Sequence, residues 1–546
     1  MDLDILIKNG IIIDGTGKLG YKSDILIKDD KIERIGTNLV NDGVKIVDAS
    51  DKLVAPGFID IHHHGDLSIL DVNKAEAAIM QGVTTLNIGM CGLGLAPAND
   101  KVREYYFNYV SKAFGGSSEL FDNLQDFFDA IEKKGISPNL IFFIPHGNVR
   151  AYVMGTDDRA ATDEELDQMK GIINNGMKSG AFGMSTGLVY PPGSISSTDE
   201  LIELSKVVSD YDGIYMSHMR NEGSHIIDIG MDELIKIARE ADIKAHISHW
   251  SVISKFAQKI TPQVINIIRE VRQKDGLKIS ADAVPYDDGS TSLSFILLSL
   301  WVYENFEQNL KIPEKRKILL DDIYRKLYSM FFADAPFYIR LIPKFILKKL
   351  IFTGLAKLVK VISVEKNKQI EGKTLYEVFK ELYPNRKLED ALLDFILEEK
   401  GDIMIQIKHK EEKINVIPIL LQDFVCVSSD GFLVKNKNTH PTSYGAFTRV
   451  LERYVRNMKI LSLEEGIRKM TSLPASILGL SDRGLIKEDY KADLVIFELE
   501  KIKEKGTLKN GAQHPEGIDY VIINGEITVS EGKHTGILKG RILKHK

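Results

Sequence analysis

The feature that most constrains the fold is an alternation of short apolar runs with longer helical patterns through the middle of the chain. Such alternation is typical of βα units, which place parallel strands side by side in one sheet. Eight runs are expected to form strands, at residues 54–62, 82–90, 139–146, 180–185, 213–218, 243–249, 278–284 and 424–430. Eight strands, each followed by helical material, predict an α/β fold of the TIM-type (β/α)8 barrel class.

Side chains that bind metals or transfer protons stand at the C-terminal ends of these runs. They are His62, His64, Cys91, His146, His218, His249, Asp282 and Asp430. His62 and His64 point to the same side because side chains alternate along a strand. Imidazoles, a thiolate and a carboxylate would together hold Zn²⁺ well, and the thiolate favours zinc over magnesium or manganese. Because the active sites of such barrels lie on this face, both patterns predict a metal site at the barrel mouth.

Some of these side chains have a structural alternative. His146 is expected either to line the site or to hold a loop. Asp282 is expected either to orient a ligand histidine or to stabilise the barrel. His246 is three residues from His249, so it faces the other side of a regular strand and is expected to be structural. Barrel packing is the expected role of Cys426.

The two ends of the chain are both rich in short apolar runs separated by turn signals. We expect residues 1–53 and 484–546 to form one small β-sandwich domain together. The barrel then occupies 54–286 and 424–483, with its eighth strand in the second part. Residues 287–423 are too long for a simple connection and are expected to form a largely helical insertion or lid.

Length and composition exclude several classes of protein. A chain of 546 residues exceeds one compact core, so several domains are expected. A formal net charge of −6 argues against nucleic-acid binding. Two cysteines exclude a disulfide scaffold. The first residues show no basic start followed by an apolar run, so we expect a cytoplasmic protein.

One segment within the insertion is unusual. Residues 336–364 carry six basic side chains, no acidic one and many apolar ones, but lysines interrupt the apolar run too often for a transmembrane helix. Three roles are open for it. The segment packs as a lid onto the barrel, lines the pocket for a lipophilic substrate group, or makes peripheral contact with a membrane surface.

At this point the chain resembles the amidohydrolase superfamily, and within it the N-acyl-D-amino-acid deacylase (D-aminoacylase) family. The resemblance runs nearly from end to end. Its carriers are Ala55-Pro56-Gly57-Phe58-Ile59-Asp60 with His62 and His64, Gly82-Val83-Thr84-Thr85 leading to Cys91-Gly92, His146-Gly147-Asn148-Val149-Arg150, Gly183-Met184-Ser185-Thr186-Gly187-Leu188 with Tyr190, His218-Met219-Arg220-Asn221-Glu222, Ser248-His249 and Ser429-Asp430-Gly431. The ordered set is much more specific than any one motif.

The resemblance implies a role for each matching residue. Cys91, His218 and His249 match a tight zinc site. His62 and His64 match the ligands of a second, weaker metal position. Asp430 matches the catalytic acid and base, which takes a proton from a metal-activated water and returns it to the leaving amine. Ser290, Tyr190 and His146 are expected to contact a small-molecule amide substrate.

Three positions depart from the family pattern. Ser251, Val284 and Thr442 stand where the deacylases usually carry a lysine, a tyrosine and an arginine that hold the substrate carboxylate. A lost charged hydrogen bond is worth roughly 1.5–3 kcal/mol, so carboxylate recognition should suffer unless another cation replaces these groups. The hypothesis is that the chemistry is retained while the substrate differs from a simple N-acyl-D-amino acid. The alternatives are a cyclic amide, a neutral or lipophilic N-acyl amide, or a non-catalytic scaffold with this fold.

Overall fold

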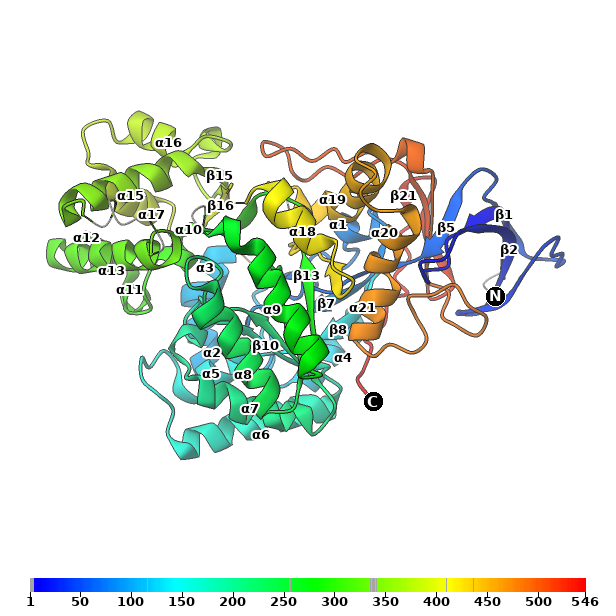
Figure 1. Cartoon of the computed structure of the whole chain (residues 1–546), viewed down its shortest axis with the longest axis horizontal. Helices are drawn as coiled ribbons and strands as arrows, with labels where there is room; N and C mark the ends of the chain where they lie inside the picture. The colour runs from blue at the N-terminus through cyan, green and yellow to red at the C-terminus, as the bar shows by residue number, and fades with distance from the viewer. Residues whose placement is uncertain are drawn as a thin grey trace.

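The computed structural model describes residues 4–114, 116–254, 257–333, 335, 339, 341–408, 410–435 and 437–546. Three parts follow one another across the molecule in Figure 1. A sheet built from both chain ends lies on one side, the barrel in the middle, and the helical insertion on the other side.

The eight predicted runs each contain a strand of the barrel. The strands are β6 (Phe58–Asp60), β7 (Val83–Ile88), β8 (Asn139–Phe142) continuing into β9 (Ile144–Pro145), β10 (Gly183–Gly187), β11 (Ile214–His218), β12 (Lys244–Ile247), β13 (Ile279–Ala283) and β17 (Val425–Val427). All neighbouring strands among them are parallel. The predicted barrel of parallel strands is therefore confirmed.

Backbone hydrogen bonds close the barrel between its first and last strands. The Asp430 N–H donates to the carbonyl of His62 over 3.0 Å, and the His64 N–H donates to the carbonyl of Gly431 over 2.8 Å. These bonds lie just beyond the ends of β6 and β17. The closure therefore places the His62 and His64 backbone directly beside that of Asp430.

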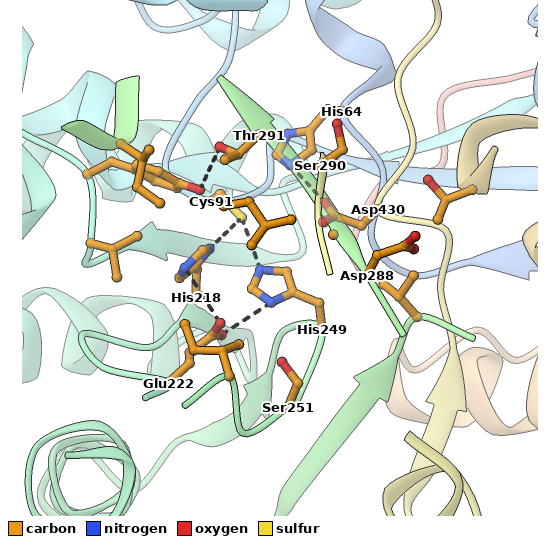
Figure 2. A pocket seen from close by; sticks show the side chains of 18 of the residues that line it. His64, Cys91, His218, Glu222, His249, Ser251, Asp288, Ser290, Thr291 and Asp430 are labelled. Carbon is orange, nitrogen blue, oxygen red and sulfur yellow. Dashed lines mark hydrogen bonds and ion pairs between the residues drawn. The ribbon is translucent and has the colours of Figure 1, made fainter. Parts of the chain in front are cut away.

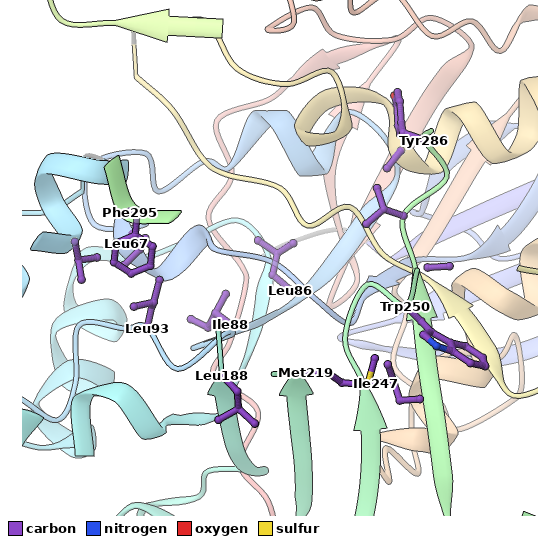
Figure 3. Packing of buried hydrophobic residues seen from close by; sticks show 14 of the residues in the cluster. Leu67, Leu86, Ile88, Leu93, Leu188, Met219, Ile247, Trp250, Tyr286 and Phe295 are labelled. Atoms are coloured by element: carbon purple, nitrogen blue, oxygen red, sulfur yellow. The ribbon is translucent and has the colours of Figure 1, made fainter. Parts of the chain in front are cut away.

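Amphipathic helices cover the outside of the barrel. The main ones are α4 (Leu124–Lys134), α6 (Asp163–Ser179), α7 (Thr198–Ser209), α8 (Asp232–Glu240), α9 (Thr261–Lys274) and α20 (Leu463–Met470). In α6 the Thr162 hydroxyl and the Glu165 carboxylate form a capping box at the N-terminus, while Met169, Ile173 and Met177 are buried. Figure 3 shows buried apolar side chains of the main hydrophobic core, among them Leu86, Ile88, Leu188 and Ile247.

Both chain ends contribute to a single nine-stranded sheet. Its strands are β1 (Ile5–Ile12), β2 (Tyr21–Lys28), β3 (Lys31–Gly36), β4 (Lys45–Asp48), β5 (Leu53–Pro56), β18 (Leu494–Phe497), β19 (Ile518–Ile523), β20 (Glu526–Ser530) and β21 (Lys533–His534). β5 pairs with β1 on one side and with β18 on the other, so it joins the N-terminal and C-terminal strands. The sheet has its own hydrophobic core, which includes Ile7, Ile25, Val54 and Leu494.

The first predicted run is shared between this sheet and the barrel. Residues 53–56 form β5, and the barrel strand begins only at Phe58. Gly57 lies between them, where a Cβ atom would come within 2.2 Å of the Thr84 hydroxyl. The chain therefore passes from one core to the other at a residue where the neighbouring strand leaves no room for a side chain.

The insertion is largely helical, as expected. Its described helices include α10 (Leu293–Leu297), α11 (Trp301–Glu304), α12 (Phe306–Lys311), α13 (Pro313–Phe331), α15 (Lys344–Leu358), α16 (Leu375–Leu382), α17 (Leu388–Glu398) and α18 (Ile417–Leu420). A three-stranded antiparallel sheet that the sequence patterns did not indicate lies at its base, formed by β14 (Gly289–Ser292), β15 (Val359–Val364) and β16 (Ile403–Ile407). This sheet anchors both ends of the insertion beside the barrel mouth.

The basic, apolar segment forms α15 and β15, except that residues 336–338 and 340 lie outside the described residues. α15 packs against α13, α16 and α17, which all belong to the insertion. Within the described parts of the chain, no helix combines the length and the apolar character needed to cross a membrane.

Candidate active site

Three barrel strands bring a thiol and two imidazoles together at the mouth. Cys91 comes three residues after β7, His218 ends β11, and His249 follows β12. The Sγ atom of Cys91 lies 3.7 Å from Nδ1 of His218 and 3.7 Å from Nε2 of His249 (Figure 2). It also lies 3.3 Å from Nε2 of His62. The thiol of Cys91 therefore stands among the predicted metal ligands.

The backbone turns sharply at three of these strand ends. The angle φ is 52° at Cys91, 35° at His249 and 49° at Asp430, so all three residues adopt the left-handed conformation. This conformation costs roughly 1–2 kcal/mol for a residue with a side chain. Strain of this kind collects at functional sites, where the surrounding structure enforces it. The strained turns thus mark the same rim as the reactive side chains.

The spacing of the ligand atoms fits a tetrahedral metal ion. With Zn–S near 2.3 Å and Zn–N near 2.0–2.1 Å, tetrahedral angles place the sulfur about 3.6 Å from each nitrogen. The three sulfur-to-nitrogen distances at Cys91 fall between 3.3 and 3.7 Å. Cys91 belongs to two compact triads, one with His218 and His249 and one with His62 and His64. The side chains can hold one ion, or two ions that share the thiolate.

The surroundings favour the thiolate form of Cys91. Burial alone would raise the pKa of this thiol, but the charge of His62 and hydrogen bonds with His218 and His249 outweigh it and hold the pKa well below its usual range. The second cysteine behaves differently, because burial raises the pKa of Cys426 well above its usual value. The thiolate is the metal-binding form of cysteine, so only Cys91 is prepared for that role.

A buried carboxylate supports both histidines of the first triad. One oxygen of Glu222 lies 3.2 Å from Nδ1 of His249, and its other oxygen lies 4.0 Å from Nε2 of His218. In each ring the opposite nitrogen faces Cys91. Glu222 carries a contact that sequence reasoning missed, although its position four residues after His218 was a usable signal. Carboxylates in this position fix the tautomer of ligand histidines.

Asp282 supports the site from β13. Its carboxylate accepts a hydrogen bond from the backbone N–H of His249 over 2.9 Å. It also lies 2.9 Å from Nε2 of His246 and 3.8 Å from Nδ1 of His62. Of the two alternatives for Asp282, these contacts favour the one in which it orients ligand groups. His246 faces this carboxylate and not the pocket.

Asp430 stands beside the second triad. Its Oδ1 atom lies 3.3 Å from Nε2 of His64 and 3.6 Å from Nε2 of His62. Burial alone would raise the pKa of Asp430, but the hydrogen bond with His64 and the charges of His249 and His62 lower it to about 2. The carboxylate is thus ionised, and with 29% of its side chain exposed it reaches the pocket.

Four of the metal-ligand candidates, His64, Cys91, His218 and His249, open into one pocket, which the barrel and the insertion line together. Ser290 and Tyr190, both predicted to contact substrate, lie in its wall, and the Tyr190 hydroxyl is 3.5 Å from that of Thr291. An apolar wall completes it, formed by Leu93, Phe114, Ile253, Ile296, Met330, Phe331 and Phe432. The pocket therefore combines a polar, metal-binding floor with an apolar surface.

All three departures from the family pattern lie in this same pocket. Ser251, Val284 and Thr442 are buried and line it. The insertion adds charged groups that the sequence patterns did not single out, namely Lys410 and Asp288. Asp288 is already paired, because His440 Nε2 lies 3.1 Å from its carboxylate.

His146 lies apart from the pocket. It begins α5 (His146–Met154), is fully buried, and places Nε2 3.1 Å from the carboxylate of Glu200. The same carboxylate pairs with the buried guanidinium of Arg150. Burial alone would raise the pKa of Glu200, but these two partners lower it to about 2. The structure therefore does not bring His146 to the other predicted site residues, and its contacts favour the loop-holding alternative.

Comparisons with known proteins agree with this geometry. The model of the amidohydrolase family matches residues 45–203 and 422–529. A D-aminoacylase of Alcaligenes xylosoxydans xylosoxydans is 30% identical over 540 residues, which cover 99% of this chain and 97% of that protein. A solved D-aminoacylase structure with a binuclear metal centre is 27% identical, has a TM-score of 0.80 and covers 99% of this chain and 100% of its own.

A second solved structure carries a ligand as well as a metal. It is an N-acyl-D-glutamate deacylase from Bordetella bronchiseptica in complex with zinc and a phosphonate that mimics the tetrahedral intermediate of its reaction. Its sequence is 25% identical, its TM-score is 0.80, and the match covers 100% of both chains. The likeness thus includes the barrel, the end sheet and the insertion.

Proposed function

Because the chain belongs to the N-acyl-D-amino-acid deacylase group of the amidohydrolase family, we propose that it is a zinc-dependent hydrolase that cleaves an N-acyl amide bond other than a peptide bond. The observation that carries the proposal is the Cys91 cluster, in which ligand atoms from separate strands stand at metal-binding distances. Similar proteins with this fold include enzymes named for amide hydrolysis and structures that contain metals.

Cys91, His218 and His249 are the proposed ligands of the tight ion. Both of these imidazoles contact Glu222, whereas His62 and His64 share Asp430 on the other side of the thiol. We assign His62 and His64, with Cys91, to a second, weaker position. An ion held by Cys91, His218 and His249 would supply Lewis-acid activation of water and of the amide carbonyl.

Asp430 is the proposed acid and base. Its ionised carboxylate faces the pocket and can accept the proton that water loses on attacking the amide carbon. The same carboxyl group can then donate that proton to the nitrogen as the C–N bond breaks. The products are a carboxylic acid and an amine, and the carboxylate of Asp430 is regenerated. Ser290 and Tyr190 are proposed to contact the substrate from the pocket wall.

The non-catalytic alternative has little support from this geometry. The carboxylate of Asp430, which lines the pocket beside the Cys91 cluster, is a proton acceptor that a metal-binding scaffold does not need. The proposed function therefore includes turnover, and metal binding alone would not satisfy it.

Two measurements test the proposal. Elemental analysis of purified protein should find zinc in the wild type and in Cys426→Ala, and much less in Cys91→Ala. In a screen of amide substrates, Asp430→Asn should retain zinc and lose the activity of the wild type by about 10²- to 10⁴-fold, the typical contribution of a general acid–base group. Wild-type protein without zinc, or Asp430→Asn with full activity, would contradict the assignment.

A further inference from the structure

Lys410 enters the pocket from the insertion. Its backbone N–H donates to the carbonyl of Asp287 over 3.1 Å, next to the start of β14. Asn415, further along the chain, binds the loop that carries Ser251, because its side-chain amide donates to the carbonyl of Val252 over 2.5 Å. Lys410 is thus held between the β13–β14 connection and the loop that follows His249.

The ammonium group of Lys410 has no hydrogen bond or ion pair with any described residue, although only 7% of the residue is exposed. Among the described residues that line the pocket, it is the only lysine or arginine. The acidic side chains of the same pocket have other partners. Asp288 pairs with His440, and Glu222 and Asp430 face the ligand histidines.

A buried, unpaired cation is costly unless a ligand pairs with it. The missing partner has a negative charge. Burial lowers the pKa of Lys410, while the carboxylates of Asp288 and Glu222 act in the opposite direction. Lys410 lines the same pocket as Ser251 and Thr442, the two positions at which the resemblance implies a cation.

We propose that Lys410 binds the substrate carboxylate in this chain and replaces the cations lost at Ser251 and Thr442. The inference rests on the proposed function and narrows its substrate class to N-acyl amino acids with a free carboxylate. If Lys410 binds the carboxylate, the replacements at Ser251, Val284 and Thr442 need not abolish carboxylate recognition. Lys410 reaches the pocket from a different element, so its geometry around the substrate differs from the family pattern.

Binding to inactive enzyme tests this inference without turnover. Zinc-loaded Asp430→Asn protein is titrated with N-acetyl-D-methionine and with its carboxamide, which differ only in charge at one end. Adding Lys410→Met should weaken binding of the acid by about 10- to 100-fold, the loss expected for one charged hydrogen bond. Binding of the carboxamide should change less than twofold. Lys408→Met is the matched control, because Lys408 is 68% exposed and pairs with Asp287 outside the pocket.

Rescue separates binding from general damage. Ser251→Lys added to Lys410→Met should restore binding of the acid, because it returns a cation to the pocket. Equal loss of both ligands without rescue, or unchanged binding of the acid, would overturn the inference. Zinc content and amide hydrolysis are measured separately in the wild type and in Lys410→Met. If the proposed function fails, both proteins lack zinc and turnover.

A second observation concerns the outer face of α15. Leu347, Ile351 and Phe352 are buried against the neighbouring helices. The opposite side exposes large apolar side chains, with Phe345 75% exposed and Leu350 53% exposed. Leu341, Ile346 and Leu358 extend this surface, which we call the α15 face.

The charged side chains that α15 itself brings to this face are all basic, although Phe345 and Lys349 also line a groove with Glu389, Asp390 and Asp394. Residues 341–358 carry four lysines and no acidic residue, in a chain whose net charge is −6. Lys344, Lys349 and Lys357 are exposed beside the apolar side chains. Basic groups around an exposed apolar surface complement an anionic bilayer, which attracts cations and accepts apolar side chains at the headgroup boundary.

We infer that the α15 face binds the surface of anionic phospholipid membranes. α15 packs on α13, whose last residues Met330 and Phe331 line the catalytic pocket. A membrane bound at this face would therefore lie against the lobe that contributes Met330 and Phe331 to the apolar wall of the pocket. This inference does not depend on the role proposed for Lys410 or on turnover.

Flotation with vesicles tests it on the full-length protein. Binding should be strong to vesicles of phosphatidylcholine with phosphatidylserine and weak to phosphatidylcholine alone. Lys349→Gln should lower the partition coefficient about fivefold at low salt, from roughly 1 kcal/mol for each basic residue near the surface. The double variant Phe345→Ser/Leu350→Ser should lower it further, whereas Leu19→Ser, at an 85% exposed position in the loop between β1 and β2, should not change it.

Two outcomes would overturn the membrane inference. Equal flotation of wild type and the double variant would show that α15 is not the contact. A concentration-dependent dimer in light scattering that Phe345→Ser/Leu350→Ser abolishes, without flotation of the wild type, would assign the face to a second copy of the chain.

Discussion

Replacing Glu222 by glutamine keeps the size of the side chain and removes the charge that faces two proposed ligands. The closer contact, 3.2 Å to Nδ1 of His249, holds the proton on that nitrogen and leaves Nε2 for the metal. The contact to His218 is longer, at 4.0 Å, and contributes less. We expect Glu222→Gln to weaken metal binding while the protein stays folded, because glutamine can still accept one hydrogen bond.

The size of the effect follows from these two distances. A hydrogen bond to a charged group contributes about 1.5–3 kcal/mol and a neutral one about 0.5–1.5 kcal/mol, so one close contact loses about 1–1.5 kcal/mol. That loss corresponds to roughly a tenfold weaker zinc affinity, at the lower end of the 10- to 100-fold range for outer-sphere partners. The longer contact adds little to this value.

Competition with a chromogenic zinc chelator measures the affinity directly. Glu233→Gln is the matched control, because Glu233 is a buried glutamate that binds Arg220 and Thr198 and touches no proposed ligand. Its zinc affinity should equal that of the wild type. If Glu222→Gln also bound zinc within twofold of the wild type, the contacts at His249 and His218 would not orient the ligands and the assignment of Glu222 would be wrong.

Three further predictions concern stability. Glu200→Gln should destabilise the protein by about 3 kcal/mol at pH 7, because a pKa lowered from 4.5 to about 2 by His146 and Arg150 is worth that amount. A depressed carboxyl pKa stabilises above the unfolded value, so in urea titrations the difference from wild type should persist above pH 5 and shrink as the pH falls toward 2. Gly57→Ala should cost about 1–3 kcal/mol, because the added methyl group overlaps the side chain of Thr84; an unchanged urea midpoint would refute this close packing. Removing zinc with a chelator should lower the thermal unfolding temperature, and zinc but not magnesium should restore it.

The barrel could be predicted because its signals are local. Each strand is a short apolar run, each helix has a 3.6-residue period, and the reactive side chains stand where the runs end. The first run shows the limit of this reasoning. Residues 54–62 look like one strand, but the chain changes core at Gly57, and only the position of Thr84 on the neighbouring strand reveals why.

The directions of the site side chains were harder to predict from the sequence. Alternation along a strand predicts the face of the sheet toward which each side chain points. Cys91, His249 and Asp430, however, lie in left-handed turns just past their strands. Side-chain direction there depends on tertiary contacts, such as the hydrogen bond from the Asp430 N–H to His62. His146 shows the converse, since a histidine at a strand end is directed to the buried pair of Glu200 and Arg150.

Lys410 could not be found from the sequence because it belongs to the insertion and not to a barrel strand. The proposed metal ligands come from barrel strands, whose order follows from the chain itself. Lys410 follows β16, which pairs with β14 and sets Gln406 opposite Ser290 across more than a hundred residues, and the Lys410 N–H itself donates to the carbonyl of Asp287. A carboxylate can bind any positive charge within reach, whichever element carries it. Lys410 of the insertion can therefore take the place of cations at positions 251 and 442. Under the Lys410 proposal, the replacements at Ser251 and Thr442 indicate a relocated carboxylate site and not a lost one.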